Sequence, residues 1–173
     1  MRYVELRRHT DNDDDRLTPS GVADVEAIGR DRLNPPYAAF VSTGAARATQ
    51  MLEILRRAAG QPELPITQAT GLRSSVEDRW RKAAAAAGKG ADLEAIRAVD
   101  PDLVDRESWL LATTLRHLVH ALPEGGRALV VGHSPTNEAA VLGLVGQVVP
   151  PLAKGAGVLV IEDGGHYRVE PLP

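Results

Sequence analysis

The sequence contains no cysteine. Disulfide bonds, thiolate zinc sites and cysteine nucleophiles are therefore all excluded. Aromatic residues make up only 3% of the 173 residues, so we expect a core built from leucine, valine, isoleucine and alanine. So few aromatic side chains also argue against a protein that binds single-stranded nucleic acid by stacking on its bases.

The chain also lacks a strong charge and a long hydrophobic run. Its formal net charge is −3 and it has no basic tail, so its electrostatics predict neither nucleic acid nor a membrane as a partner. No apolar run approaches the length of a membrane span. The first eight residues form a predicted strand that contains charged residues, and they lack the pattern of a secretory signal. We therefore expect a cytoplasmic protein. The sequence does not determine its oligomeric state.

The order of strand and helix patterns predicts one α/β domain over residues 1–173. Strands are predicted at 2–8, 38–42, 64–67, 128–131, 157–162 and 166–170, the last two forming a hairpin. Helices are predicted between these strands, with Thr18, Thr43 and Ser134 as side-chain caps. We expect a three-layer α/β/α sandwich with a mainly parallel sheet and a C-terminal β-hairpin.

Residues 69–105 differ from the rest of the chain because they are charged and rich in alanine. Two short helices are predicted there, at about 75–87 and 92–98, with Trp80 as the only large anchor. We expect this segment to be an insertion that covers a ligand pocket like a cap. Its sequence has no pattern that identifies a substrate.

Three predicted strand ends are each followed by polar residues and a helix start: 6–10, 41–49 and 130–138. In open α/β sheets, ligands bind beyond the carboxyl ends of the strands, where helix N-termini favour anions. The polar residues there are His9, His133, Arg8 and Arg47. Arginine can grip phosphoryl oxygens and a neutral imidazole can attack phosphorus, so this set predicts a phosphoryl site.

Each of these residues also has an ordinary structural explanation. A histidine at a strand end is often a satisfied polar residue, and the arginines could form surface ion pairs. Their joint occurrence in the same structural context favours a site. The sequence has no Walker-type glycine loop and no acidic metal cluster, so no metal and no organic cofactor is predicted.

Four motifs support a more specific interpretation. In chain order they are Arg8-His9-Thr10, Leu17-Thr18-Pro19-Ser20-Gly21, the segment 42–50 with Ser42, Arg47 and Thr49, and Gly132-His133. In these motifs, which extend over nearly the whole chain, the sequence resembles the histidine phosphatase superfamily, branch 1, whose members are phosphoglycerate mutase-like. Its length is closest to the short members, which include bacterial phosphohistidine phosphatases.

The resemblance implies a phosphatase that hydrolyses a phosphomonoester or a phosphohistidine. It implies that His9 accepts the phosphoryl group and that Arg8, Arg47 and His133 form the rest of the phosphate pocket. The implied partner is a phosphorylated small molecule or a phosphohistidine protein. A phosphoglycerate mutase-like phosphotransferase and a non-catalytic phosphate-binding module remain as alternatives.

Two departures from the family pattern affect the implied site. The family has glycine after the nucleophile, where this chain has Thr10, whose hydroxyl could donate to phosphate. Asn12 and Ser134 are further candidate donors to the substrate. Longer relatives carry a glutamate as general acid after the third strand. The nearest candidate here is Glu77, followed by Asp78. Both residue types are also common in the first turn of a helix, where a negative charge complements the helix dipole.

Overall fold

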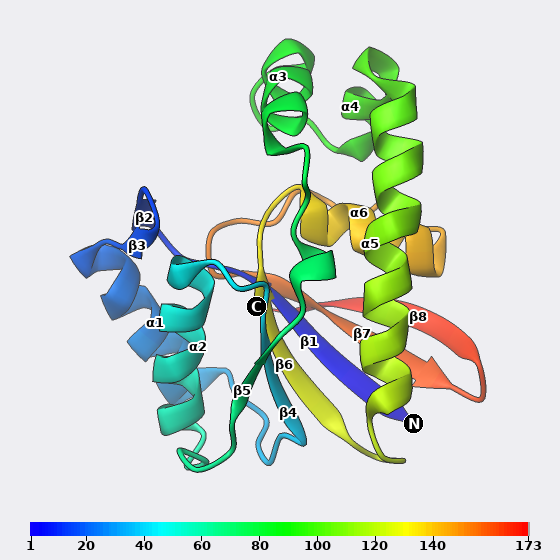
Figure 1. Cartoon of the computed structure of the whole chain (residues 1–173). Helices are drawn as coiled ribbons and strands as arrows, with labels where there is room; N and C mark the ends of the chain where they lie inside the picture. Colours follow the sequence, from blue (N-terminus) through cyan, green and yellow to red (C-terminus); the bar gives the residue numbers. More distant parts are fainter. Residues whose placement is uncertain (173) are drawn as a thin grey trace.

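A six-stranded sheet forms the centre of the computed structural model, which describes residues 1–172 (Figure 1). The strands lie in the order β5 (Ile66–Gln68), β4 (Ala39–Ser42), β6 (Arg127–Gly132), β1 (Arg2–Arg8), β7 (Gly157–Asp163) and β8 (His166–Leu172). The first four are parallel, whereas β7 is antiparallel to β1 and pairs with β8 in the C-terminal hairpin. The predicted mainly parallel sheet is therefore confirmed.

Helices cover both faces of this sheet. They are α1 (Pro19–Asp31) and α2 (Ala46–Ala58) on one face, and α5 (Pro101–Ala121) and α6 (Thr136–Val145) on the other (Figure 1). Strand β6 shows why: Leu129 and Val131 pack in the cluster of α1 and α2, and Ala128 and Val130 pack in the cluster of α5 and α6. Alternate side chains of a strand point to opposite faces, so a fully apolar strand requires a layer on each side.

Two smaller parts stand at the carboxyl edge of the sheet. The residues after β5 form η1 (Thr70–Leu72), α3 (Glu77–Ala87) and α4 (Leu93–Val99), and α3 and α4 lie beyond the strand ends beside the start of α5 (Figure 1). Trp80 is buried, and its indole Nε1 donates to Glu107 of α5. After β1, the short strands β2 (Asn12–Asp13) and β3 (Arg16–Leu17) form a hairpin in a segment where no strand was predicted.

Of the three predicted helix caps, one is confirmed and two are wrong. The Thr18 hydroxyl accepts a hydrogen bond from the Gly21 backbone N–H at 3.0 Å, as an N-cap does. Helices α2 and α6 begin later than predicted and have no side-chain cap. The hydroxyls of Thr43 and Ser134 instead bind His133 and Glu138, so both side chains belong to the site described below.

Among the described residues, no helix is both long enough and apolar enough to cross a membrane.

Candidate active site

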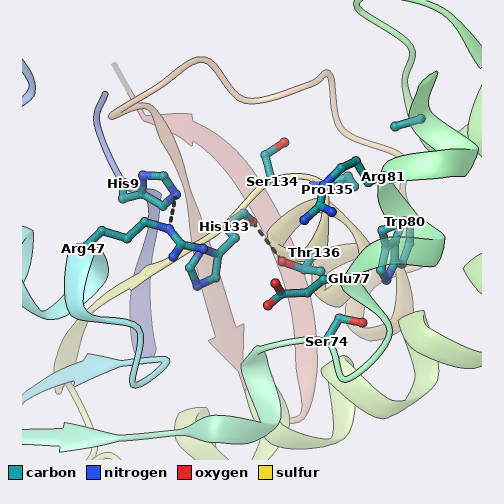
Figure 2. Close-up of a pocket in the computed structure, with 11 residues that line it drawn as sticks. His9, Arg47, Ser74, Glu77, Trp80, Arg81, His133, Ser134, Pro135 and Thr136 are labelled. Atoms are coloured by element: carbon teal, nitrogen blue, oxygen red, sulfur yellow. Dashed lines mark hydrogen bonds between the residues drawn. The ribbon is translucent and has the colours of Figure 1, made fainter. Parts of the chain in front are cut away.

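Two histidines and an arginine meet where three adjacent strands end. His9 follows β1, His133 follows β6, and Arg47 lies in the first turn of α2, which follows β4. The Arg47 guanidinium donates through Nε to His9 Nε2 at 3.2 Å and lies with Nη2 3.3 Å from His133 Nδ1 (Figure 2). The two imidazole rings are 5.2 Å apart between centroids. Three residues far apart in the sequence thus face one point.

Hydrogen bonding fixes which nitrogen of His9 carries the lone pair. Nδ1 lies 2.8 Å from the Thr10 carbonyl oxygen, which can only accept, so the proton is on Nδ1 and the lone pair is on Nε2. Burial lowers the pKa of His9, and the charges of Arg47, Arg8 and Lys154 lower it further, against the opposing effect of the Thr10 carbonyl. The imidazole is therefore neutral at neutral pH, the form that can act as a nucleophile.

His133 is held neutral more strongly. Burial, followed by the charge of Arg47, lowers its pKa to about 3. Its Nε2 lies 2.8 Å from the Thr43 hydroxyl. Because Arg47 donates to Nδ1, we assign the proton to Nε2, which donates to Thr43. His133 thus connects Arg47 to the end of β4.

Asp15 also contacts Arg47, although the sequence motifs assign it no role. Its Oδ1 accepts from Arg47 Nη1 at 2.9 Å and from the Arg47 backbone N–H at 3.3 Å. Desolvation alone would raise the pKa of Asp15, but hydrogen bonds from the backbone N–H groups of Arg47 and Ala46 and from the guanidinium lower it overall. The β2–β3 hairpin brings this carboxylate to α2. In the sequence, Asp15 is only the last of three aspartates in a polar stretch, and it has no distinguishing signal.

A cavity of about 300 Å³ opens beside these residues (Figure 2). His9, Arg47 and His133 line one side. The other walls come from the segment after His133 and from α3 with the residues just before it: Ser134, Pro135, Thr136, Ser74, Glu77, Trp80, Arg81 and Ala84. The structure therefore places Glu77 in the same cavity as His9. Its Oε1 accepts from Arg73 Nε at 2.6 Å.

Arg8 and Asn12 do not line this cavity. The Arg8 guanidinium donates to the Leu152 carbonyl oxygen at 2.7 Å and lines an adjoining cavity. Its charge still contributes to lowering the pKa of His9. The Asn12 amide donates to the Asp14 carbonyl within the β2–β3 turn.

Thr10 and Ser134 differ in their relation to the cavity. Thr10 is buried, and its hydroxyl donates to the Gly21 carbonyl oxygen at 2.8 Å, so this hydroxyl is used within the protein. Thr10 faces Gly155, which has no side chain and so leaves room for the threonine. A Cβ at position 155 would lie only 3.1 Å from the Thr10 methyl group. Ser134 lines both cavities, and its hydroxyl binds the Glu138 carboxyl.

No group of three or more histidine, cysteine, aspartate or glutamate side chains within residues 1–172 is arranged to hold a metal ion.

No family model and no curated protein sequence matches the chain. Solved structures do match it. A phosphoglycerate mutase from Bacillus anthracis has a TM-score of 0.68 at 17% identity, covering 98% of this chain and 92% of that one. A mutant phosphoserine phosphatase from Entamoeba histolytica, in complex with phosphoserine, also has a TM-score of 0.68, at 16% identity, covering 98% and 95%.

A mycobacterial glucosyl-3-phosphoglycerate phosphatase in complex with inorganic phosphate has a TM-score of 0.65 at 16% identity, covering 98% of this chain and 96% of that one. At such identities the likeness shows the fold, and function has to be argued from the site. The chain has the phosphoglycerate mutase-like fold, as the sequence motifs predicted.

Proposed function

We propose that this chain, with its phosphoglycerate mutase-like fold, is a phosphatase that hydrolyses its substrate through a phosphohistidine intermediate on His9. The observation that carries the proposal is the geometry of Arg47, whose guanidinium contacts both His9 Nε2 and His133 Nδ1 at the wall of one cavity. A phosphoryl group in this cavity would meet a neutral nucleophile and a fixed cation together. The substrate class is a phosphomonoester or a phosphohistidine.

In the first step, the His9 Nε2 lone pair attacks phosphorus, a P–N bond forms and the bond from phosphorus to the leaving atom breaks. The Arg47 N–H groups stabilise the charge on the transferring oxygens, and Asp15 and His133 hold the guanidinium in place. In the second step, water attacks phosphorus, the P–N bond breaks and phosphate leaves. Arg8, in the adjoining cavity, adds a second positive charge near the phosphoryl group.

Glu77 supplies the proton that an alkoxide leaving group needs. It lines the same cavity from the opposite wall. In the free protein its carboxylate is paired with Arg73, which holds it at this wall. The same carboxylate can then accept the proton of the attacking water.

We expect Glu77→Gln to lower kcat/KM for an alkyl phosphate by about 10²-fold and for p-nitrophenyl phosphate by less than about 3-fold, because nitrophenolate leaves without a proton. Steady-state kinetics with both esters measure this. Asp78→Asn is the matched control, since Asp78 is the next residue and is highly exposed. Equal losses for the two esters would remove Glu77 from the role of general acid.

The pH profile tests the state of His9. Protonation removes the nucleophilic lone pair, so activity falls as the pH falls through the pKa of His9. Because burial and nearby cations lower that pKa from its usual value near 6.5, the acid limb of kcat/KM for p-nitrophenyl phosphate should lie below pH 6.5. The ionisation of the substrate is titrated separately and subtracted. An acid limb above pH 6.5 would contradict the described environment of His9.

Turnover itself separates an enzyme from a phosphate-binding module. The purified protein should release p-nitrophenol and inorganic phosphate in equal amounts over many turnovers. Binding of phosphate, seen by calorimetry, without release of nitrophenol would favour the non-catalytic module.

A further inference from the structure

Helix α5 carries an apolar patch on its exposed face. Trp109 is 68% exposed, and the adjacent Leu110 is 41% exposed. Within residues 1–172, Trp109 is the only tryptophan, tyrosine or phenylalanine whose side chain is exposed. The patch lies near the middle of α5, a helix that runs from α4 to the level of the N-terminus (Figure 1). An exposed tryptophan beside an exposed leucine is typical of a surface that binds another protein.

A groove of about 360 Å³ lies beside this patch, between α5 and the residues that follow β5. Trp109 and Leu110 line it from α5, and Gly71 and Ser74 line it from the other side. Ser74 also lines the cavity that contains His9. The surface beside Trp109 is therefore hollowed and has room for a side chain of a partner, which would then lie beside a wall of the candidate active site.

Charged residues on the same helix are arranged symmetrically about Trp109. Asp102 lies seven residues before it and Arg116 seven residues after it, and both are exposed. Seven residues make about two helical turns, so these three side chains lie along one line on α5. Neither Asp102 nor Arg116 forms an ion pair within residues 1–172, whereas Asp105 is paired with Arg97.

This line of side chains is complementary to a second copy of itself. Two α5 helices that pack antiparallel about a two-fold axis at Trp109 place residues at equal distances before and after it opposite each other. Arg116 of each copy then faces Asp102 of the other, and the two indole rings meet at the axis. Arg106, a further exposed cation, faces position 112, which is a buried alanine. The pairing thus joins opposite charges and sets no arginine against another.

We infer that the exposed face of α5 is a self-association surface whose partner is a second copy of this chain, packed antiparallel with Trp109 at its centre and an Asp102–Arg116 ion pair on each side. The inference goes beyond the proposed function and is independent of it, because this contact needs no phosphorylated ligand. In a two-fold interface every contact occurs twice, so each substitution acts twice.

Sedimentation equilibrium of the purified chain measures the association. The average mass should rise from that of one chain towards that of two between about 1 µM and about 1 mM, the range expected for a small interface. Trp109→Ala should weaken the association by about 10-fold or more, because it removes the central indole from both copies. A wild-type chain that stays monomeric over this whole range would overturn the inference.

Charge reversal tests the antiparallel orientation. Asp102→Arg sets arginine against arginine, and Arg116→Asp sets aspartate against aspartate, so each variant alone should associate at least about 10-fold more weakly than the wild type. An equimolar mixture of the two variants should recover the association, since every arginine at these positions then faces an aspartate of the other chain. Asp24→Arg, at an exposed position on α1, is the charge-matched control and should change nothing.

Two results would overturn the assignment to α5 even if the chain dimerises: single reversals that associate as well as the wild type, or a mixture that stays monomeric. Fluorescence gives an independent reading, because the chain has two tryptophans and Trp80 is already buried. Emission should shift to shorter wavelength as the average mass rises, and a constant emission maximum would also contradict a contact at Trp109. His9→Ala should associate like the wild type, so failure of the phosphatase proposal and failure of this inference are separate results.

Discussion

Replacing His9 with alanine should lower kcat/KM for p-nitrophenyl phosphate by about 10⁴-fold or more, the scale of loss when a covalent nucleophile is removed. The reason is geometric. His9 Nε2 is an unprotonated nitrogen that accepts from Arg47 Nε at the wall of the cavity, so an arriving phosphoryl group meets the lone pair and the guanidinium together. Without His9, that lone pair is lost.

The control for this experiment is His166→Ala, which removes an exposed imidazole in the β7–β8 hairpin. It should keep full activity. Unfolding curves in urea should show that the His9→Ala protein is folded, because the lost side chain bonds only to the adjacent Thr10 carbonyl and to Arg47, which keeps its contacts with Asp15 and His133. A folded His9→Ala protein that keeps activity within about 10-fold of wild type would exclude the covalent mechanism.

Arg47→Ala should lower kcat/KM by about 10²- to 10³-fold, the cost of losing one fixed donor to a transition state. The change removes the positive charge from the cavity and leaves Asp15, whose carboxylate would then repel a phosphate dianion. Arg47→Lys should recover only part of the loss, because an ammonium group keeps the charge but cannot contact His9, His133 and Asp15 together as the planar guanidinium does.

The matched control is Arg57→Ala, at an exposed position on the same helix, α2. It should change kcat/KM by less than about 2-fold. If Arg47→Ala were equally mild, Arg47 would serve the structure of α2 and not the reaction.

The sequence predicted the fold well because the pattern of β6 and its neighbours is simple. A strand that is apolar at every position, such as residues 128–131, can only be buried on both faces, and this places helices on each side. The pattern of strands followed by helices also placed His9, His133 and Arg47 just after strand ends. Their direct contacts depend on strand order, which brings β1, β6 and β4 side by side.

The position of Arg8 was harder to predict. Adjacent residues of a strand point in opposite directions, so a pattern that places Arg8 and His9 at one strand end does not place them in one cavity. Here Arg8 points to the adjoining cavity and His9 to the one that Arg47 also lines. The contact of Asp15 with Arg47 was not predicted either, because it depends on the β2–β3 hairpin, where no strand was expected.

The helix caps show a further limit of local patterns. Thr43 and Ser134 stand where a capping residue is expected, and their residue types are right for that role. In the folded chain their hydroxyls bind His133 and Glu138, because long-range partners compete with the helix ends for the same groups.

The central claim, a phosphoryl group carried on His9, is tested most directly by trapping it. The protein is mixed with p-nitrophenyl phosphate for milliseconds, denatured in alkaline detergent to preserve phosphohistidine, digested and analysed by tandem mass spectrometry. We predict phosphorylation of His9, present during turnover and absent once the substrate is exhausted. Steady turnover with no phosphoryl group on His9 at any time, or with one on a different residue, would contradict the account.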